Sequence, residues 1–239
     1  MVERSESGTG PVDRTWNRMK RRRVRILDVL LLSVLTACTI DAATKMDEDI
    51  GHSARQAFHA GDTLMKLGGA KNEALAAQYY KRAAEMGSHW GYYKYGTMLL
   101  EGKGVTKDVP AAAQAFAKAA AENNGWAQYQ LGVLYLDGNG VPKDVPRATE
   151  LLGKAAEQNI GWAQYRLGDL YATGADAPQD LAKARAYLEK AAAQDITYAQ
   201  YALANMIIDT EPQRARTLLQ KAAAAGNQLA VKRLAQLTS

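Results

Sequence analysis

Residues that could carry out chemistry are few and scattered in this sequence. His52 and His59 could share a helix face, but no carboxylate or third ligand stands at metal-binding spacing, and His89 is the only other histidine. The segment Gly102-Lys103-Gly104 lacks the Ser or Thr and the earlier glycine of a phosphate-binding loop. No serine or cysteine lies in a recognisable nucleophile setting. The sequence therefore predicts no catalytic residue, no metal ligand and no cofactor, and a protein that is not an enzyme.

The only cysteine, Cys38, ends a segment of distinct composition. Residues 20–25 are basic, and the apolar run 29–37 is too short for a membrane-spanning helix, which needs about 20 residues. This order is typical of a secretory signal peptide. The end of the run, Leu35-Thr36-Ala37-Cys38, resembles a bacterial lipobox. The resemblance implies that residues 1–37 are a removed signal peptide and that Cys38 is lipidated and anchors the mature chain to a membrane.

The residues around Cys38 refine this expectation. Thr39 stands where lipoproteins retained at the inner membrane often have aspartate, so the resemblance implies the outer membrane and its periplasmic face. Residues 38–53 are mostly small and polar and are interpreted as a flexible tether. Either Met1 or Met19 could be the true start, and both leave signal and lipobox intact. The alternative is a cytosolic protein whose basic N-terminus imitates a signal.

Most of the net charge of +5 belongs to the N-terminal segment. Residues 1–37 hold eight Lys and Arg against four Asp and Glu, so the remaining chain is close to neutral. Because affinity for phosphates grows with the number of Lys and Arg contacts, nucleic acid is not an expected partner.

A repeat of 36 residues organises everything after the tether. Trp90, Trp126 and Trp162 recur at this spacing, and glycines 96, 132 and 168 follow in step. The units span about 54–88, 89–124, 125–160, 161–196 and 197–228, the last with an inner loop five residues shorter, and 229–239 is a half-unit expected to form a capping helix. Self-similarity at such a period is typical of stacked helical repeats.

Each unit divides into two predicted helices. In the unit 125–160, the first helix buries Ala127, Leu131, Leu134 and Tyr135, and Gly132 indicates a neighbouring helix too close for a side chain. Asp144 is placed to cap the second helix, and Asp108 and Asp180 recur at the same position. The short last unit offers a capping box at 210–213 instead.

The pattern best seen at 131–156, LGxLYxxGxGVxxDxxxAxxxxxKAA, resembles the Sel-1-like repeat, a relative of the tetratricopeptide repeat. The resemblance covers about 54–239. It implies an all-α fold, a right-handed α/α superhelical solenoid of about five helix pairs plus a C-terminal capping helix, used to hold other proteins. Envelope lipoproteins of this kind include scaffolds for exopolysaccharide secretion, so exopolysaccharide export is one candidate pathway.

The most polar stripe of each first helix consists of an aromatic residue and the residues 4, 7 and 11 positions after it, as in Trp90, Lys94, Thr97 and Glu101, and in Trp126, Gln130, Val133 and Asp137. In tetratricopeptide relatives this side lines a concave groove, so the partner-binding candidates are Trp90, Lys94, Trp126, Gln130, Trp162, Arg166 and Tyr198. The competing interpretation is that each Trp seals one unit against the next.

Three functions are compatible with these features. The first is an outer-membrane-anchored periplasmic scaffold that binds other envelope proteins. The second is a glycan-binding lipoprotein that uses its aromatic residues against polysaccharide. The third is a cytosolic adaptor, if the signal is spurious.

Overall fold

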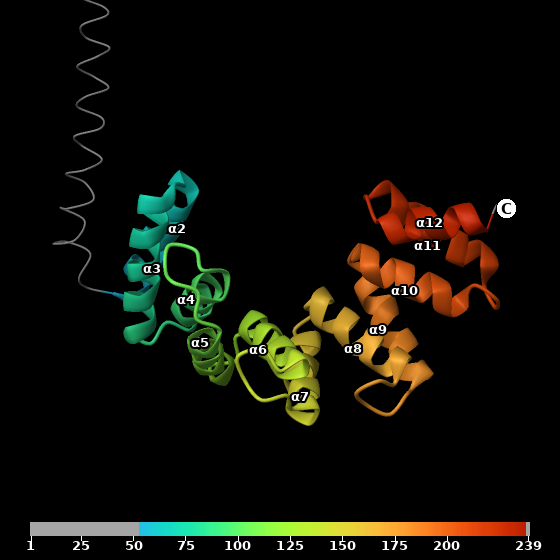
Figure 1. Cartoon of the computed structure of the whole chain (residues 1–239), viewed down its shortest axis with the longest axis horizontal. Coiled ribbons are helices and arrows are strands. Elements are labelled where there is room, and N and C mark those ends of the chain that lie inside the picture. Colours follow the sequence, from blue (N-terminus) through green and yellow to red (C-terminus); the bar gives the residue numbers. More distant parts are fainter. Residues whose placement is uncertain (1–52, 238–239) are drawn as a thin grey trace, which may run out of the picture. The chain divides into compact units, whose positions relative to one another are not determined.

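The structure, a computed structural model, describes residues 53–237, and this part of the chain is helical without strands. The first helices of the pairs are α2 (Ala54–Leu67), α4 (His89–Glu101), α6 (Gly125–Asp137), α8 (Gly161–Thr173) and α10 (Thr197–Ile207). Their partners are α3 (Ala70–Glu85), α5 (Val109–Ala121), α7 (Val145–Glu157), α9 (Leu181–Ala193) and α11 (Pro212–Ala224), and α12 (Gln228–Gln236) follows (Figure 1). The predicted signal peptide, Cys38, His52 and nearly all of the predicted tether lie outside the described residues.

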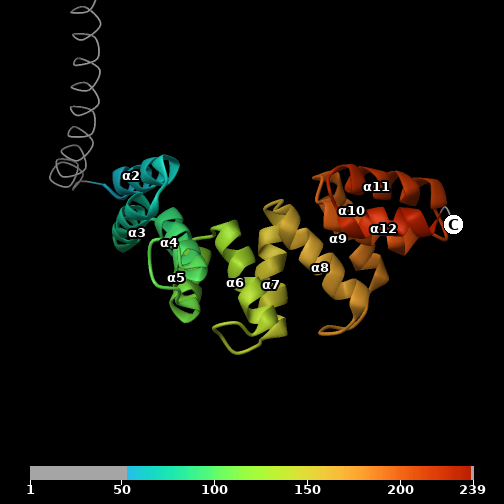
Figure 2. The same cartoon turned by 45° about the horizontal axis from the view of Figure 1, so that its top comes forward.

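The helices stack in chain order. Each odd-numbered helix from α3 to α11 packs on the helix before it and also contacts the helix after it, and α12 packs on α11 as a terminal half-pair (Figure 2). Each pair thus contacts mainly its neighbours, as in a solenoid. The predicted all-α fold of about five helix pairs with a C-terminal helix is confirmed.

The recurrent glycine of the first helix marks close packing within a pair. A Cβ built on Gly132 would lie 2.9 Å from the Leu152 Cγ atom, and one on Gly168 would lie 2.7 Å from the Leu188 Cγ atom. The degenerate first unit has the same feature, because a Cβ on Gly61 would lie 2.7 Å from the Tyr80 ring. The predicted close approach is confirmed.

Capping aspartates begin three of the second helices. The side chains of Asp108, Asp144 and Asp180 accept hydrogen bonds from backbone N–H groups three residues later, at 2.9–3.0 Å. The predicted capping role of these carboxylates is confirmed. The capping box predicted at 210–213 is wrong: Glu211 is the N-cap of α11 without a side-chain capping bond, and the Thr210 hydroxyl donates to the Ile207 carbonyl.

A row of amides fills the joints between units. The Gln158 Nε2 atom donates to the Gln128 Oε1 atom at 2.8 Å and to the Asn123 Oδ1 atom at 3.1 Å. Gln128 is only 2% exposed, and its own amide donates to the Ala120 carbonyl. Asn159, Gln164 and Gln194 repeat this arrangement one unit later. Because a buried amide group without partners costs about 1–3 kcal/mol, the row favours one specific docking of each unit on the next.

Burial is shared between neighbouring pairs. One cluster joins Phe116 of α5 to Leu131 of α6, the next joins Leu152 to Leu167, and the third joins Leu188 to Leu219. On α6, the predicted buried residues Ala127, Leu131 and Leu134 are buried, whereas Tyr135 is only partly buried. Among the described helices, none is both long and apolar enough to cross a membrane.

Candidate functional site

The aromatic residues at the head of each polar stripe are partly exposed. Trp90, Trp126, Trp162 and Tyr198 are each the second residue of a first helix, and their exposed fractions are 41%, 40%, 37% and 47%. Leucines that pack units together, such as Leu131 at 3%, are buried far more deeply. These four side chains therefore pack against the protein and also leave aromatic surface exposed to solvent.

A tyrosine supports each tryptophan from the same helix. The ring of Trp126 meets Tyr129 edge to face, with centroids 6.4 Å apart at 87°, and Trp162 meets Tyr165 in the same way at 6.2 Å. Burial raises the pKa of both tyrosine hydroxyls above the ordinary value. Edge-to-face contact with a partly buried neutral ring restricts the conformations that each of these tryptophans can adopt.

Contacts between units join the stripes of neighbouring first helices. The Arg166 guanidinium lies 3.4 Å from the Asp137 carboxylate of the preceding unit. The ring of Tyr198 lies 6.1 Å from that of Trp162 and 6.0 Å from that of Tyr165. The stripes of α6, α8 and α10 are therefore linked by these contacts.

The N-terminal end of the stripes has a pocket of about 420 Å³. Lys94, Thr97 and Glu101 of the α4 stripe line it, together with Asp62 and Lys66 of α2. Sequence reasoning missed the α2 side because the first unit has no tryptophan. Aligning Gly61 with Gly96 would have placed Asp62 and Lys66 in the stripe.

A buried tyrosine shapes the wall of this pocket. The Tyr80 hydroxyl donates to the Asp62 carboxylate at 2.6 Å. Burial, followed by that hydrogen bond and the charge of Asp62, raises the pKa of Tyr80 far above its ordinary value, so the phenol is neutral. The pocket thus combines an apolar wall, which includes Met65 and Met98, with cationic and anionic groups at its edge.

His89 and Lys103, which were considered above as candidates for metal or phosphate binding, make contacts with other parts of the fold. The His89 Nδ1 atom lies 3.2 Å from the Asn124 side-chain amide, which belongs to the N-cap of α6. Lys103 of the glycine-flanked segment forms an ion pair with Glu73 at 3.5 Å. Within residues 53–237, no three His, Cys, Asp or Glu side chains are arranged to hold a metal ion.

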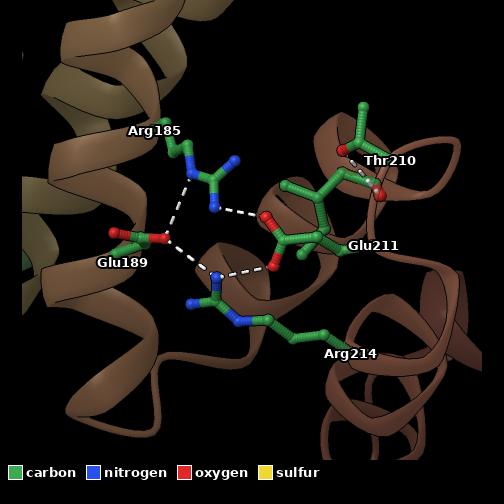
Figure 3. Close-up of polar contacts among 6 residues, drawn as sticks. Arg185, Glu189, Thr210, Glu211 and Arg214 are labelled. Carbon is green, nitrogen blue, oxygen red and sulfur yellow. Dashed lines mark hydrogen bonds and ion pairs between the residues drawn. The ribbon is translucent and has the colours of Figure 1, made fainter.

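A network of four charged residues joins α9 to α11 (Figure 3). Arg185 and Glu189 of α9 face Glu211 and Arg214, and Arg185 bonds both carboxylates. Arg214 lies 3.1 Å from Glu189 and 3.0 Å from Glu211. Hydrogen bonds from Arg214 and Arg185 hold the pKa of Glu211 below its ordinary value. Sequence reasoning missed this network because its members belong to two neighbouring units.

The helices are stacked in pairs, and a recurrent glycine in the first helix lets the two helices of a pair approach closely. Aspartates cap second helices, and the first helices share one surface. These features define a helical-repeat solenoid. The Sel1 repeat model matches residues 56–88, 91–125, 127–160, 163–196 and 197–227, which are most of the chain. The chain belongs to the Sel1 repeat family.

Solved structures support this assignment. A Sel1 repeat protein from Oxalobacter formigenes is 27% identical with a TM-score of 0.71, covering 77% of this chain and 78% of that one. The protective antigen c5321 of uropathogenic Escherichia coli is also 27% identical, with a TM-score of 0.70; the match covers 77% of this chain but only 41% of the antigen. YrrB, a TPR protein with an unusual peptide-binding site, shares the fold at 22% identity and a TM-score of 0.51, with 80% and 97% covered. No curated protein matches the sequence.

Proposed function

We propose that this protein is a non-enzymatic, lipid-anchored scaffold that binds other envelope proteins on the stripes of its first helices. The observation that carries the proposal is the row of partly exposed aromatic residues, Trp90, Trp126, Trp162 and Tyr198. Tryptophan and arginine dominate the binding energy of many protein interfaces, and Arg166 lies on the same stripe of α8 as Trp162. Family membership supports a scaffold, since Sel1 repeats are typically binding modules.

The exposure of the tryptophans favours binding over sealing as their main role. A side chain that served only to seal two units would be buried like Leu131, whereas Trp126 keeps 40% of its surface exposed. A binding residue must leave that surface accessible to a partner. The contact between Trp162 and Tyr198 shows that packing between units also uses part of the row.

The cellular address of the proposal comes from the sequence around Cys38. A single acyl chain holds a protein to a bilayer only marginally, and the diacylated cysteine of a lipoprotein provides a stable anchor. We propose that Cys38 carries this anchor and holds the repeats at the periplasmic face of the outer membrane. An envelope assembly, with exopolysaccharide export as the candidate pathway, is the proposed setting.

The anchor is tested by labelling cells with a palmitate analogue. Wild-type protein should be labelled and should fractionate with the outer membrane, and Cys38→Ala should be unlabelled and released from it. Labelling that persists in Cys38→Ala would overturn the proposed anchor. The binding surface is tested by a separate experiment.

The binding surface is tested in two steps. A photoreactive residue at position 130 crosslinks the partner in cells, and capture of that partner by the wild-type protein is then compared with its capture by Trp126→Ala. The matched control is Leu181→Ala, because Leu181 is a large apolar residue at the start of α9, outside the stripes, with 55% exposure. Trp126→Ala should reduce partner capture at least tenfold while the helical circular dichroism spectrum persists, and Leu181→Ala should not. Unchanged capture in the double variant Trp126→Ala/Trp162→Ala would refute the surface, and saturable binding to polysaccharide that these substitutions abolish would favour the glycan-binding alternative.

A further inference from the structure

The joint before α12 differs from the earlier joints in its polar contacts. Gln200 is 3% exposed and occupies the position of Gln128 and Gln164 in the amide row. Its Nε2 atom donates to the Ala192 carbonyl and to Asp195, as in the earlier units, but its Oε1 atom is buried without a hydrogen-bond partner among the described residues. The position that Gln158 and Gln194 take in earlier units is Ala225 here, and alanine has no group to donate.

A second polar group is left unpaired at the same joint. Asn227 is 8% exposed, and its Oδ1 atom caps α12 by accepting from the Leu229 and Ala230 N–H groups. Its Nδ2 atom is buried and has no partner among the described residues. The equivalent residue of the second unit is Asn124, whose amide is paired with His89. Thr197, at the position equivalent to His89, is shorter.

A pocket of about 320 Å³ lies at this joint. Asn227, Ala225 and Thr197 line it, and Tyr198 and Leu229, both more than 40% exposed, form part of its rim. Neither Gln200 nor Asp195 lines the pocket. Ala225 does, and it holds the position from which Gln158 and Gln194 reach Gln128 and Gln164 in their own units.

We propose that this pocket binds the side-chain carboxamide of an Asn or Gln residue from a protein partner. The NH₂ of a carboxamide donates to the Gln200 Oε1 atom and to Asp195, as the Gln158 amide does to Gln128 and Asn123. The carbonyl oxygen of the same group accepts from the Asn227 Nδ2 atom. An ammonium group would satisfy the acceptors but not Asn227, and a carboxylate would satisfy Asn227 but not the acceptors, so both are disfavoured.

This inference does not depend on the tryptophan row, because Gln200, Asp195 and Asn227, which bind the carboxamide, lie outside that row. Tyr198 belongs to the row and to the rim of the pocket, so a partner lying along the row could place an amide in the pocket. The test uses a small probe, and its failure therefore leaves the proposed scaffold function unaffected.

The probe is the peptide acetyl-Gly-Gln-Gly-amide, with analogues that carry Glu or Met in place of Gln. Their binding is followed by NMR through the side-chain amide resonances of Asn227 and Gln200 in the whole repeat protein. The Gln peptide should shift both resonances saturably, and the Glu and Met peptides should bind at least fivefold more weakly, about the loss expected for one buried hydrogen bond. Equal shifts from all three peptides, or no saturable shift, would overturn the proposal.

Two variants make the result specific. Asn227→Asp keeps a capping oxygen for α12 but removes the donor, so it should weaken binding of the Gln peptide at least fivefold without lowering the melting temperature. Thr197→Gly/Ala225→Gln recreates the glycine and glutamine of the earlier units, where a Cβ on Gly161 would lie 3.0 Å from the Gln194 Oε1 atom. This double variant should abolish binding and raise the melting temperature relative to Thr197→Gly alone. Undiminished binding by both variants would refute the assigned site.

Discussion

Two glycines in helix interiors should respond oppositely to the same substitution. Replacing glycine with alanine in a helix is worth about 1 kcal/mol from backbone propensity alone. Gly153 lies in α7, and a Cβ built on it meets nothing within 4 Å. Gly153→Ala should therefore stabilise the protein by about 0.5–1 kcal/mol.

At Gly132 the packing cost should exceed this gain. The added Cβ would lie 2.9 Å from the Leu152 Cγ atom, 3.2 Å from its Cδ2 atom and 3.3 Å from the Ala148 carbonyl oxygen. Leu152 is fully buried, so it cannot turn away without displacing its neighbours. Overpacking of this kind costs about 1–3 kcal/mol, which leaves Gly132→Ala destabilised by up to about 2 kcal/mol.

Urea denaturation followed by circular dichroism measures both variants against the wild type. The reasoning is refuted if Gly132→Ala is as stabilising as Gly153→Ala. That result is physically conceivable because Ala204 takes this position in the fifth pair, opposite Leu219. As a further check, Leu152→Ala should cost about 1 kcal/mol less in the Gly132→Ala background than in the wild type, since the two substitutions share one contact.

Three further predictions concern stability along the solenoid. Leu131→Ala should cost about 2–5 kcal/mol in urea denaturation, because Leu131 is 3% exposed, whereas Leu229→Ala at 46% exposure should cost under about 1 kcal/mol. Removing residues 228–239 should lower the melting temperature and promote aggregation seen by light scattering, because α12 covers α11; unchanged melting and solubility would contradict the capping role. Glu211→Gln should lower the melting temperature at neutral pH, since the lowered pKa of Glu211 means that its charged form stabilises the fold. That difference should persist down to the ordinary glutamate range, near pH 4.3, and disappear as the pH falls through the lowered pKa; a constant difference at all pH values would contradict the ion-pair mechanism.

Features that depend on residues within one unit were predictable from sequence. Gly132 and Asp144 have local roles, since a close approach and a helix cap are set by the helix pair that contains them. The order of the pairs followed from the repeat, because short connections place consecutive helices side by side.

Features that depend on contacts between units were not predictable in the same way. The charged network around Glu211 was missed because Arg185 and Glu189 belong to the preceding unit. The pocket beside Lys94 was missed because its other wall comes from α2, whose register the tryptophan pattern does not reveal. In both cases the missing information is which side chains a neighbouring unit presents.

The short inner loop of the last pair explains why the charged network occurs where it does. In the second and third pairs this loop packs on the preceding unit: a Cβ on Gly104 would lie 2.3 Å from the Glu73 carbonyl oxygen, and one on Gly140 would lie 2.9 Å from the Val109 carbonyl carbon.

In the fourth pair, an ion pair of 2.5 Å between Lys143 and Asp176 connects the inner loop to the inner loop of the third pair. In the fifth pair α10 ends at Ile207 and α11 begins at Pro212, so less chain is available to reach the neighbour. There Glu211, at the start of α11, connects the fifth pair to the preceding unit through the charged network. Because this network adds to the buried cluster that contains Leu188 and Leu219, protonation of Glu211 in acid should weaken the α9–α11 contact without opening its apolar core.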